Sequence, residues 1–262
     1  DKRKNIRNGE SRMKALITGA SSGIGREIAL YLSDLGYDII VVARNELALK
    51  DIQREVKTKV EVVSMDLTDR ENVWKLHEMY KNEPIEVLVN NAGFGVHGLV
   101  TETNLEKDLE LIDLNITALH MLTKLFLKDM KKRNLGYILN VSSIAGFLSG
   151  PLMAEYYASK NFVLSYTKAI YTELKKEGSE VHISALCPGP TKTNFNKVAK
   201  VDFRMKSYSA EYVAEYGINK MFEEKPVIIP GFKMKFVHVA SKLLPSSLTS
   251  EFAYEIQRRK RK

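Results

Sequence analysis

Short runs of apolar, often β-branched residues alternate along the chain with longer stretches in which apolar residues recur at helical spacing. The short runs predict strands at Lys14–Thr18, Asp38–Ala43, Val60–Met65, Ile85–Asn90, Gly136–Val141, Val181–Cys187 and Val227–Pro230. The longer stretches predict helices at roughly Gly23–Leu35, Glu46–Lys57, Arg70–Tyr80, Leu105–Lys132, Glu155–Lys176 and Ala210–Phe222. This alternation is typical of βαβ units, so we expect an α/β fold with a doubly wound parallel sheet of about seven strands.

The pattern also suggests how the chain divides. With 262 residues the chain can bury one large core, and no repeat or linker interrupts residues 13–231. Met13 stands directly before the first strand, so residues 1–12 read as a basic extension, native or added, outside the fold. We therefore predict one domain at 13–231, followed by a helical extension with a basic tail at 232–262.

That C-terminal extension is amphipathic. Its apolar positions recur at helical spacing, whereas Lys235, His238 and Lys242 fall on another arc; the apolar positions are Phe232, Phe236, Val239, Ala240 and Leu243. Pro245 ends this pattern, and Ser247 or Thr249 could cap a second helix. We expect the apolar stripe to pack on the body or on a second subunit. A basic amphipathic segment that touches a membrane surface, or one that closes over a substrate, stays an alternative.

Charge and cysteine content narrow the function classes. The net charge is +8, but residues 1–12 contribute +3 and residues 258–262 contribute +5, so the remainder is neutral and nucleic acid is not an expected partner. Cys187 is the only cysteine, which favours a reducing, cytoplasmic setting. The sequence contains neither a run of about 18 apolar residues nor a hydrophobic signal segment. The five histidines form no metal-binding spacing, and we predict no metal.

A glycine-rich turn joins the first strand to the first helix, with the sequence Thr18-Gly-Ala-Ser-Ser-Gly-Ile-Gly25. Gly19 permits a tight turn, Gly23 lets the backbone approach a pyrophosphate, and Gly25 lets the helix pack on the strand. Free N–H groups at the helix start attract such an anion. The turn therefore predicts a Rossmann-type dinucleotide site.

Tyr156 and Lys160 are the candidate catalytic pair. Four residues apart on a predicted helix, they share one face, and a nearby ammonium favours ionisation of the phenol. Tyr156 could therefore donate or accept a proton near neutral pH. Tyr157 lies three residues from Lys160, and we expect it to pack between helices instead.

These motifs together resemble the short-chain dehydrogenase/reductase family, in its compact single-domain branch. The resemblance runs from Met13 to about Pro230 and includes the glycine turn, Asp66-Leu67, Asn90-Asn-Ala-Gly93, Asn115, Ser142-Ser143, Tyr156 with Lys160, and Pro188-Gly189. The C-terminal part is similar to a bacterial subgroup of general NADP-dependent oxidoreductases.

The resemblance implies a cofactor site and a catalytic set. Its cofactor residues are Thr18, Gly19, Ser21, Ser22, Gly23, Ile24, Gly25, Arg44, Asn45, Asp66, Leu67, Asn91, Ala92, Gly93, Tyr156, Lys160, Pro188, Gly189, Thr191 and Thr193. Arg44 stands where an acidic residue would bind the NAD ribose, which favours the 2′-phosphate of NADP(H). The implied catalytic residues are Asn115, Ser143, Tyr156 and Lys160, with Asn115 anchoring a water in a proton relay and Ser142 structural.

The expected substrate is a lipophilic ketone or aldehyde, or the corresponding alcohol, because the candidate pocket residues are mostly apolar. They are Phe94, Val96, Ser143, Met153 and Phe195, with Leu148, Leu152, Phe203 and Met205 as further candidates. The family commonly forms homodimers or homotetramers, which we expect here. Two other functions stay open: a non-catalytic dinucleotide sensor on the same fold, and a sugar-nucleotide epimerase or dehydratase.

Overall fold

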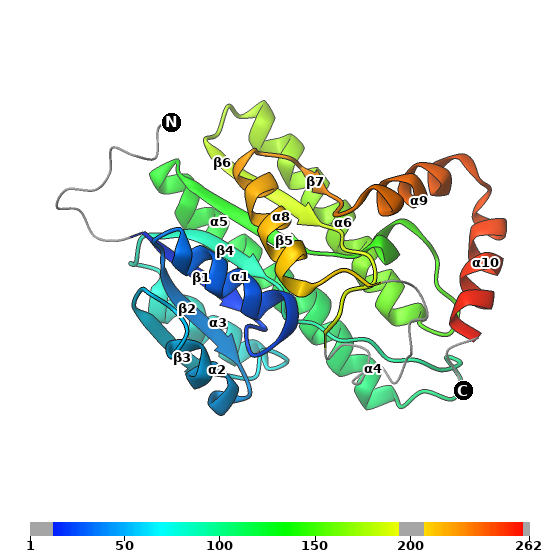
Figure 1. The fold of residues 1–262 in the computed structure, drawn as a ribbon, viewed down its shortest axis with the longest axis horizontal. Coiled ribbons are helices and arrows are strands. Elements are labelled where there is room, and N and C mark those ends of the chain that lie inside the picture. The colour runs from blue at the N-terminus through cyan, green and yellow to red at the C-terminus, as the bar shows by residue number, and fades with distance from the viewer. Residues whose placement is uncertain (1–12, 194–206, 259–262) are drawn as a thin grey trace.

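The computed structural model describes residues 13–193 and 207–258, and its centre is one parallel sheet (Figure 1). Seven strands lie in the order β3-β2-β1-β4-β5-β6-β7. They are β1 (Lys14–Thr18), β2 (Asp38–Ala43), β3 (Val60–Ser64), β4 (Ile85–Asn90), β5 (Gly136–Val141), β6 (Val181–Leu186) and β7 (Val227–Ile228). All pairs are parallel, which confirms the predicted doubly wound α/β fold.

Helices cover both faces of the sheet because alternate side chains of each strand point to opposite sides. On one face, Ile17 and Val41 pack with α1 (Gly23–Asp34), α2 (Glu46–Gln53) and α8 (Ala210–Phe222). On the other, Leu16 and Ile40 pack with α3 (Arg70–Tyr80), α5 (Leu119–Arg133) and α6 (Ala154–Lys176). The two cores are buried almost completely, so the carboxyl ends of the strands are held at fixed positions.

The predicted long helix at Leu105–Lys132 is interrupted. It consists of α4 (Leu105–Ile112), a π-helical segment (Asp113–Ala118) and α5. A π-helical turn inserts an extra residue into the helix and is frequent at functional sites. The prediction of one regular helix is therefore wrong at the residues that carry Asn115.

The predicted C-terminal helices exist as α9 (Phe232–Leu243) and α10 (Ser246–Arg258), which lie together at one end of the molecule (Figure 1). The packing face differs from the expected one. Met234, Val237 and His238 face the body, where Met234 meets Gly189 and the ring centroid of His238 lies 4.0 Å from that of Phe147. The predicted apolar stripe is exposed instead, apart from the partly buried Ala240, because α9 is apolar on two opposite sides.

Candidate active site

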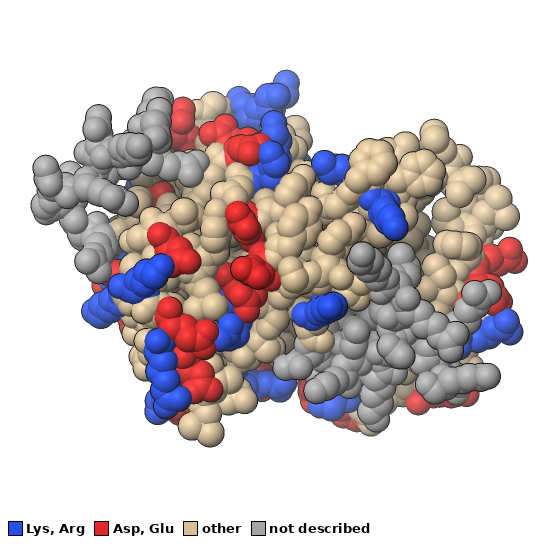
Figure 2. All heavy atoms as spheres, in the orientation of Figure 1, with Lys and Arg blue, Asp and Glu red and all other residues tan. Residues whose placement is uncertain are grey.

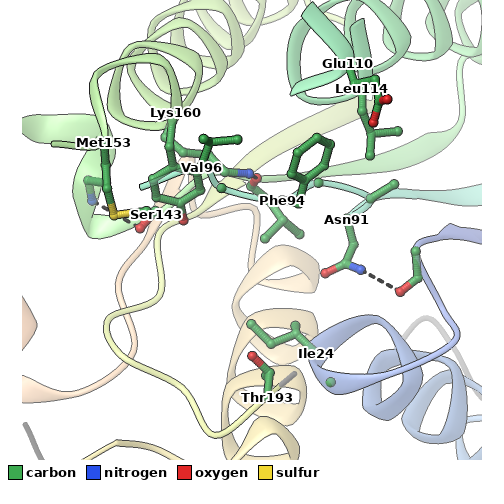
Figure 3. Close-up of a pocket in the computed structure, with 18 of the residues that line it drawn as sticks. Ile24, Asn91, Phe94, Val96, Glu110, Leu114, Ser143, Met153, Lys160 and Thr193 are labelled. Atoms are coloured by element: carbon green, nitrogen blue, oxygen red, sulfur yellow. Dashed lines mark hydrogen bonds between the residues drawn. The ribbon is translucent and has the colours of Figure 1, made fainter. Parts of the chain in front are cut away.

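A cavity of about 1140 Å³ opens at the carboxyl ends of the strands. Its walls come from the β1–α1 turn, the ends of β2, β3, β4 and β5, the start of α6, the loop after β6 and the end of α10. This volume is at the upper limit of ordinary ligand pockets, which gives room for a dinucleotide together with a small substrate. The cavity also spans the point between β1 and β4 where the strand order reverses, the usual ligand site of open α/β sheets. Figure 3 shows part of its wall.

The glycine turn packs too closely against its neighbours to admit side chains at Gly19 and Gly23. Gly19 and Gly23 have φ angles of 65° and 57°, in the left-handed region that favours glycine. A Cβ atom on Gly19 would lie 2.7 Å from the Cα atom of Ala92, and one on Gly23 would lie 2.8 Å from Cγ2 of Thr193. Ser22 precedes α1 without capping it through its side chain. The uncapped N–H groups of the first helical turn fit a phosphate group.

Two predicted cofactor residues, Thr18 and Gly25, do not line the cavity. The Thr18 hydroxyl accepts hydrogen bonds from the N–H groups of Asn91 and Ala92 and donates to the carbonyl of Val89. Asn91 Nδ2 in turn donates to the carbonyls of Thr18 and Gly19, and a side chain on Gly25 would collide with the Asn91 amide (Figure 3). Thr18 and Gly25 therefore shape the turn from behind, and Asn91 ties β1 to β4.

Arg44 and Asp66 face each other at the outer end of the cavity, with Nη1 and Oδ2 3.5 Å apart. Burial alone would raise the pKa of Asp66, but hydrogen bonds from Thr68 and the charge of Arg44 outweigh it and hold that pKa below its usual value. Asn45 accepts a hydrogen bond from the Ala48 N–H and so begins α2. Leu67 completes this part of the wall. The side chain that directly follows β2 is thus the guanidinium of Arg44, and the acidic group next to it, Asp66, comes from the end of β3.

Asn115 sits in the π-helical segment and is buried behind the cavity wall. Its Oδ1 accepts from the Phe94 N–H at 3.1 Å, and its Nδ2 donates to the Phe94 carbonyl at 2.9 Å and to the Ser159 hydroxyl at 3.1 Å. A Cβ atom on Gly93 would lie 2.8 Å from Asn115 Oδ1 and 3.6 Å from Lys160 Nζ. Asn115 therefore holds the backbone at 93–94 in place, and both Asn115 and Lys160 lie close to the side of Gly93 where a side chain would project.

Ser143, Tyr156 and Lys160 meet at the inner end of the cavity. Ser143 begins a short 3-10 helix, Ile144–Phe147, and its hydroxyl is hydrogen-bonded to Tyr156. Lys160 Nζ donates to the Val141 carbonyl at 2.8 Å and lies 5.8 Å from the centroid of the Tyr156 ring. Ser142 also lines the cavity, and it donates to the Lys160 carbonyl at 2.8 Å, a contact in keeping with the structural role predicted for it. The end of β5 and one turn of α6 thus bring a hydroxyl, a phenol and an ammonium together.

Burial dominates the acid–base properties of this corner. Burial raises the pKa of Tyr156 to about 12, and the hydrogen bond with Ser143 offsets this only in part. Burial also lowers the pKa of Lys160 to about 8. Lys160 is not among the groups that shift the Tyr156 pKa in this structure, because its ammonium is held by the Val141 carbonyl and desolvation dominates. That Lys160 lowers this pKa stays a prediction. At neutral pH, Tyr156 is therefore a protonated acid beside a buried cation.

The C-terminal helix supplies a wall that the sequence did not reveal. Gln257 of α10 is only 2% exposed, and its Nε2 donates to the Tyr157 hydroxyl at 2.7 Å. A ring nitrogen of His97 lies 3.3 Å from the Gln257 carbonyl oxygen. Tyr157 also packs on Gly150, so it faces this contact and not the Lys160 ammonium. Gln257 is one hundred residues from Tyr157, and nothing in the spacing of the sequence indicates the contact.

The remaining predicted residues fall into three groups. Those that line the cavity are Gly19, Ser21, Ser22, Gly23, Ile24, Asn45, Ala92, Gly93, Phe94, Val96, Met153, Pro188, Gly189, Thr191 and Thr193. Leu148 and Leu152 are absent from its wall, although Leu152 has a strained φ of 65° directly before Met153. Phe195, Phe203 and Met205 lie outside the described residues.

Comparisons with known proteins agree with this geometry. The family model for short chain dehydrogenases matches residues 13–202. A 3-oxoacyl-(acyl-carrier-protein) reductase from Haemophilus influenzae is 32% identical over 186 residues, which are 70% of this chain and 76% of that protein.

Two solved structures have similar folds. A short-chain dehydrogenase from Sphingobium yanoikuyae in complex with NADPH has a TM-score of 0.79 and 28% identity, and the match covers 88% of this chain and 91% of that one. A short-chain dehydrogenase/reductase from Burkholderia phymatum in complex with NAD has a TM-score of 0.79 and 25% identity, with 89% and 92% covered. From the matched motifs, the parallel sheet and the family model, the chain belongs to the short-chain dehydrogenase/reductase family, a family of nicotinamide-dependent oxidoreductases.

Proposed function

We propose that this protein is an NADP(H)-dependent oxidoreductase that interconverts a lipophilic ketone or aldehyde and its alcohol. The observation that carries the proposal is the position of Tyr156, which shares one cavity with the glycine turn and is hydrogen-bonded to Ser143. The turn would hold the dinucleotide pyrophosphate, and Ser143 and Tyr156 would hold the reacting oxygen. When bound, the cofactor supplies or accepts the hydride.

Tyr156 is the general acid of the reduction. Negative charge develops on a carbonyl oxygen as hydride reaches its carbon, so a proton donor at that oxygen stabilises the transition state. With a pKa raised to about 12, the Tyr156 phenol keeps its proton at neutral pH until the oxygen becomes basic enough to take it. Ser143 donates a second hydrogen bond to the same oxygen. In the reverse direction the phenolate form of Tyr156 accepts the proton of the alcohol, while Ser143 keeps its hydrogen bond to the same oxygen.

Lys160 supports this proton transfer. Donation leaves a phenolate on Tyr156, and the buried ammonium nearby stabilises that charge more strongly than it would in water. Asn115 acts as a positioning residue, because it fixes the backbone at 93–94 next to Lys160. We propose that a water held near Asn115 connects Lys160 to solvent and restores the Tyr156 proton.

Arg44 supports the choice of NADP(H). Its guanidinium suits a 2′-phosphate, with Ser21, Ser22 and the Asn45 amide nitrogen beside it in the cavity wall. Both an NADPH complex and an NAD complex occur among the similar structures, so the preference rests on this residue. Asp66 would accept a hydrogen bond from the adenine amino group.

The substrate part of the site supports a largely apolar molecule. Phe94, Val96 and Met153 line it (Figure 3). Polar groups in the same cavity wall include those of His97, Lys107, Glu110, Tyr157 and Gln257. The Haemophilus influenzae relative is named for reduction of a 3-oxoacyl group, which is a ketone on an acyl chain. A long-chain carbonyl compound agrees with both observations.

A spectrophotometric screen tests the proposal. The purified chain is mixed with NADPH and a panel of ketones and aldehydes of increasing chain length, and the loss of NADPH absorbance is followed. We expect turnover with some apolar members and none with the Tyr156→Phe variant. NADPH binding without turnover of any panel member, or of the matching alcohols with NADP, would favour the alternative of a non-catalytic sensor.

Self-association is the remaining part of the proposal. Leu105, Leu109 and Ile112 form an exposed row on α4, and Phe162 is exposed on the neighbouring α6. This apolar face suits a two-fold interface between identical subunits, which supports a homodimer or homotetramer. Light scattering should therefore give at least twice the monomer mass, and Leu109→Glu should lower it.

A further inference from the structure

Helix α9 carries an apolar stripe that faces solvent. Phe232, Phe236, Val239 and Leu243 are 84%, 68%, 53% and 79% exposed. Their spacings of four, three and four residues place them within an arc of roughly 60°, since successive helical residues are about 100° apart. The opposite side of α9 packs on the body through Met234, Val237 and His238. The exposed stripe is therefore not the side of α9 that packs on the core, because Met234, Val237 and His238 already form that side.

The stripe continues beyond α9. Leu244 lies in the turn, and Leu248 and Phe252 follow on α10 at intervals of four residues; all three are exposed. Most of the surface at the upper right of Figure 2, over α9 and the turn, accordingly carries no charge. Single exposed apolar residues are ordinary, but a contiguous set of this kind marks a contact surface.

Positive charge accompanies the stripe. On the helix, Lys233 and Lys235 project about 100° and 60° to either side of it, and the Lys235 ammonium lies 5.8 Å from the Tyr216 ring centroid. In the sequence, residues 231–262 contain eight Lys and Arg against Glu251 and Glu255, a net charge of +6. The rest of the domain, residues 13–230, has a net charge of −1. The apolar stripe thus belongs to a part of the sequence that is basic, whereas residues 13–230 are close to neutral.

We infer that this surface, the α9–α10 stripe, binds a lipid bilayer that contains anionic lipids. Phenylalanine and leucine on one arc can enter the acyl boundary, while lysines beside them reach the phosphates. A second copy of the chain fits less well, because a two-fold contact through the stripe would bring the lysines beside it, Lys233 and Lys235, together from both copies. The exposed row on α4 and α6 offers self-association a different face. No helix within the described residues is long and apolar enough to cross a membrane, so the contact is peripheral.

Vesicle sedimentation of the full chain tests this inference independently of any enzyme activity. Vesicles of phosphatidylcholine alone are compared with vesicles that also contain phosphatidylglycerol, at low and at high salt. The test variant is Phe232→Ser with Phe236→Ser, and the matched control is Trp74→Ser, which removes an exposed aromatic side chain from α3. Melting temperatures and light-scattering masses are measured for all three proteins.

We expect the unmodified chain and the control to bind the anionic vesicles and to be released by high salt. The double variant should bind at least about tenfold more weakly, since each phenylalanine contributes more than one tenfold step when buried, and its melting temperature should not fall. Failure of the unmodified chain to bind the anionic vesicles overturns the inference. Equal binding by the double variant also overturns it, because the binding would then come from the basic tail and not from the stripe. If the unmodified chain does not bind vesicles and the double variant has a lower light-scattering mass than the unmodified chain, the stripe is a contact between two copies of the chain instead.

Discussion

The two ends of the cavity are built in different ways. The nucleotide end consists of backbone turns at the ends of strands, such as the turn of Gly19 and Gly23, which packs closely on Ala92 and Thr193. The substrate end is assembled from side chains of distant segments, with His97, Met153, Tyr157 and Gln257 around one space. The backbone turn is suited to the pyrophosphate, which all dinucleotides share. The side chains at the substrate end can be substituted one at a time during evolution. The substrate end is therefore where relatives with this fold can differ.

The two ends also differ in solvation. Arg44 and Asp66 remain partly exposed, so their charges act through solvent as well as directly. Lys160 is almost fully enclosed and Tyr156 is partly buried, and burial shifts the pKa values of both. A charge change at the nucleotide end should alter binding, while one at the enclosed corner should alter chemistry and folding.

The largest expected effect is the loss of the Tyr156 hydroxyl. Tyr156→Phe should lower kcat by about 10³-fold, because the variant loses the hydroxyl that transfers its proton to the carbonyl oxygen, while Ser143 can only stabilise that oxygen by a hydrogen bond. NADPH affinity, measured by calorimetry, should stay within about twofold, since the hydroxyl acts on the substrate. Tyr157→Phe is the matched control and should retain most of kcat. An inactive Tyr157→Phe with an active Tyr156→Phe would contradict the assignment.

Arg44 is expected to decide the cofactor. The unmodified protein should prefer NADPH to NADH by about 10- to 1000-fold, because a charge-assisted contact with a phosphate contributes a few kcal/mol. Arg44→Asp should reverse the order by introducing repulsion of the 2′-phosphate. The comparison variant Arg54→Asp changes charge at the far end of α2 and should leave the preference intact. Equal dissociation constants for both cofactors in the unmodified protein would refute the role of Arg44.

Lys160 should make stability depend on pH. Its pKa falls from 10.5 to about 8 on folding, so the unfolded chain binds its proton more tightly. The buried ammonium therefore lowers the free energy of unfolding by roughly 3 kcal/mol at most. This loss of stability is fully present below about pH 8 and disappears as the pH rises toward 10.5. Above about pH 10, the raised pKa of Tyr156 acts in the opposite direction.

Urea denaturation of the unmodified protein and Lys160→Met between pH 7 and pH 10 measures this effect. Between about pH 8 and pH 10, the unmodified protein should gain stability relative to the variant. Lys168→Met, at an exposed position on the same helix, should show no such change. A constant difference between Lys160→Met and the unmodified protein would mean that Lys160 is not desolvated.

The smallest expected effect is at Gln257. Gln257→Leu keeps most of the side-chain volume but removes the hydrogen bond to Tyr157, a contact of about 1 kcal/mol. We expect KM for the carbonyl substrate to rise by up to about tenfold, with NADPH affinity unchanged. Combining Gln257→Leu with Tyr157→Phe should add little, because both remove the same bond. If the effects of the two substitutions on KM add fully, or if NADPH affinity changes as much as KM does, α10 does not act at the substrate end.

Most of the fold follows from local patterns. The strands and helices of the domain were predicted within a few residues, because buried parallel strands need continuous apolar runs and their covering helices need apolar stripes. The glycine turn was predictable for the same reason, since its strained φ angles restrict the residue type. The helix over Leu105–Lys132 failed at Asp113–Ala118, where sequence periodicity does not reveal a π-helical turn.

The sequence by itself determined the order of the elements, the family and the residues that can carry acid–base chemistry. Only the tertiary structure decided which of them meet and in what environment. Burial set the pKa values of Tyr156 and Lys160 in directions that a helical spacing cannot give, because desolvation depends on everything packed around a group. Two faces of α9 are apolar, and the face with Met234 and His238 packs on the body, while Phe232 and Phe236 stay exposed. With α9 in this orientation the stripe faces solvent, and α10 places Gln257 at the cavity.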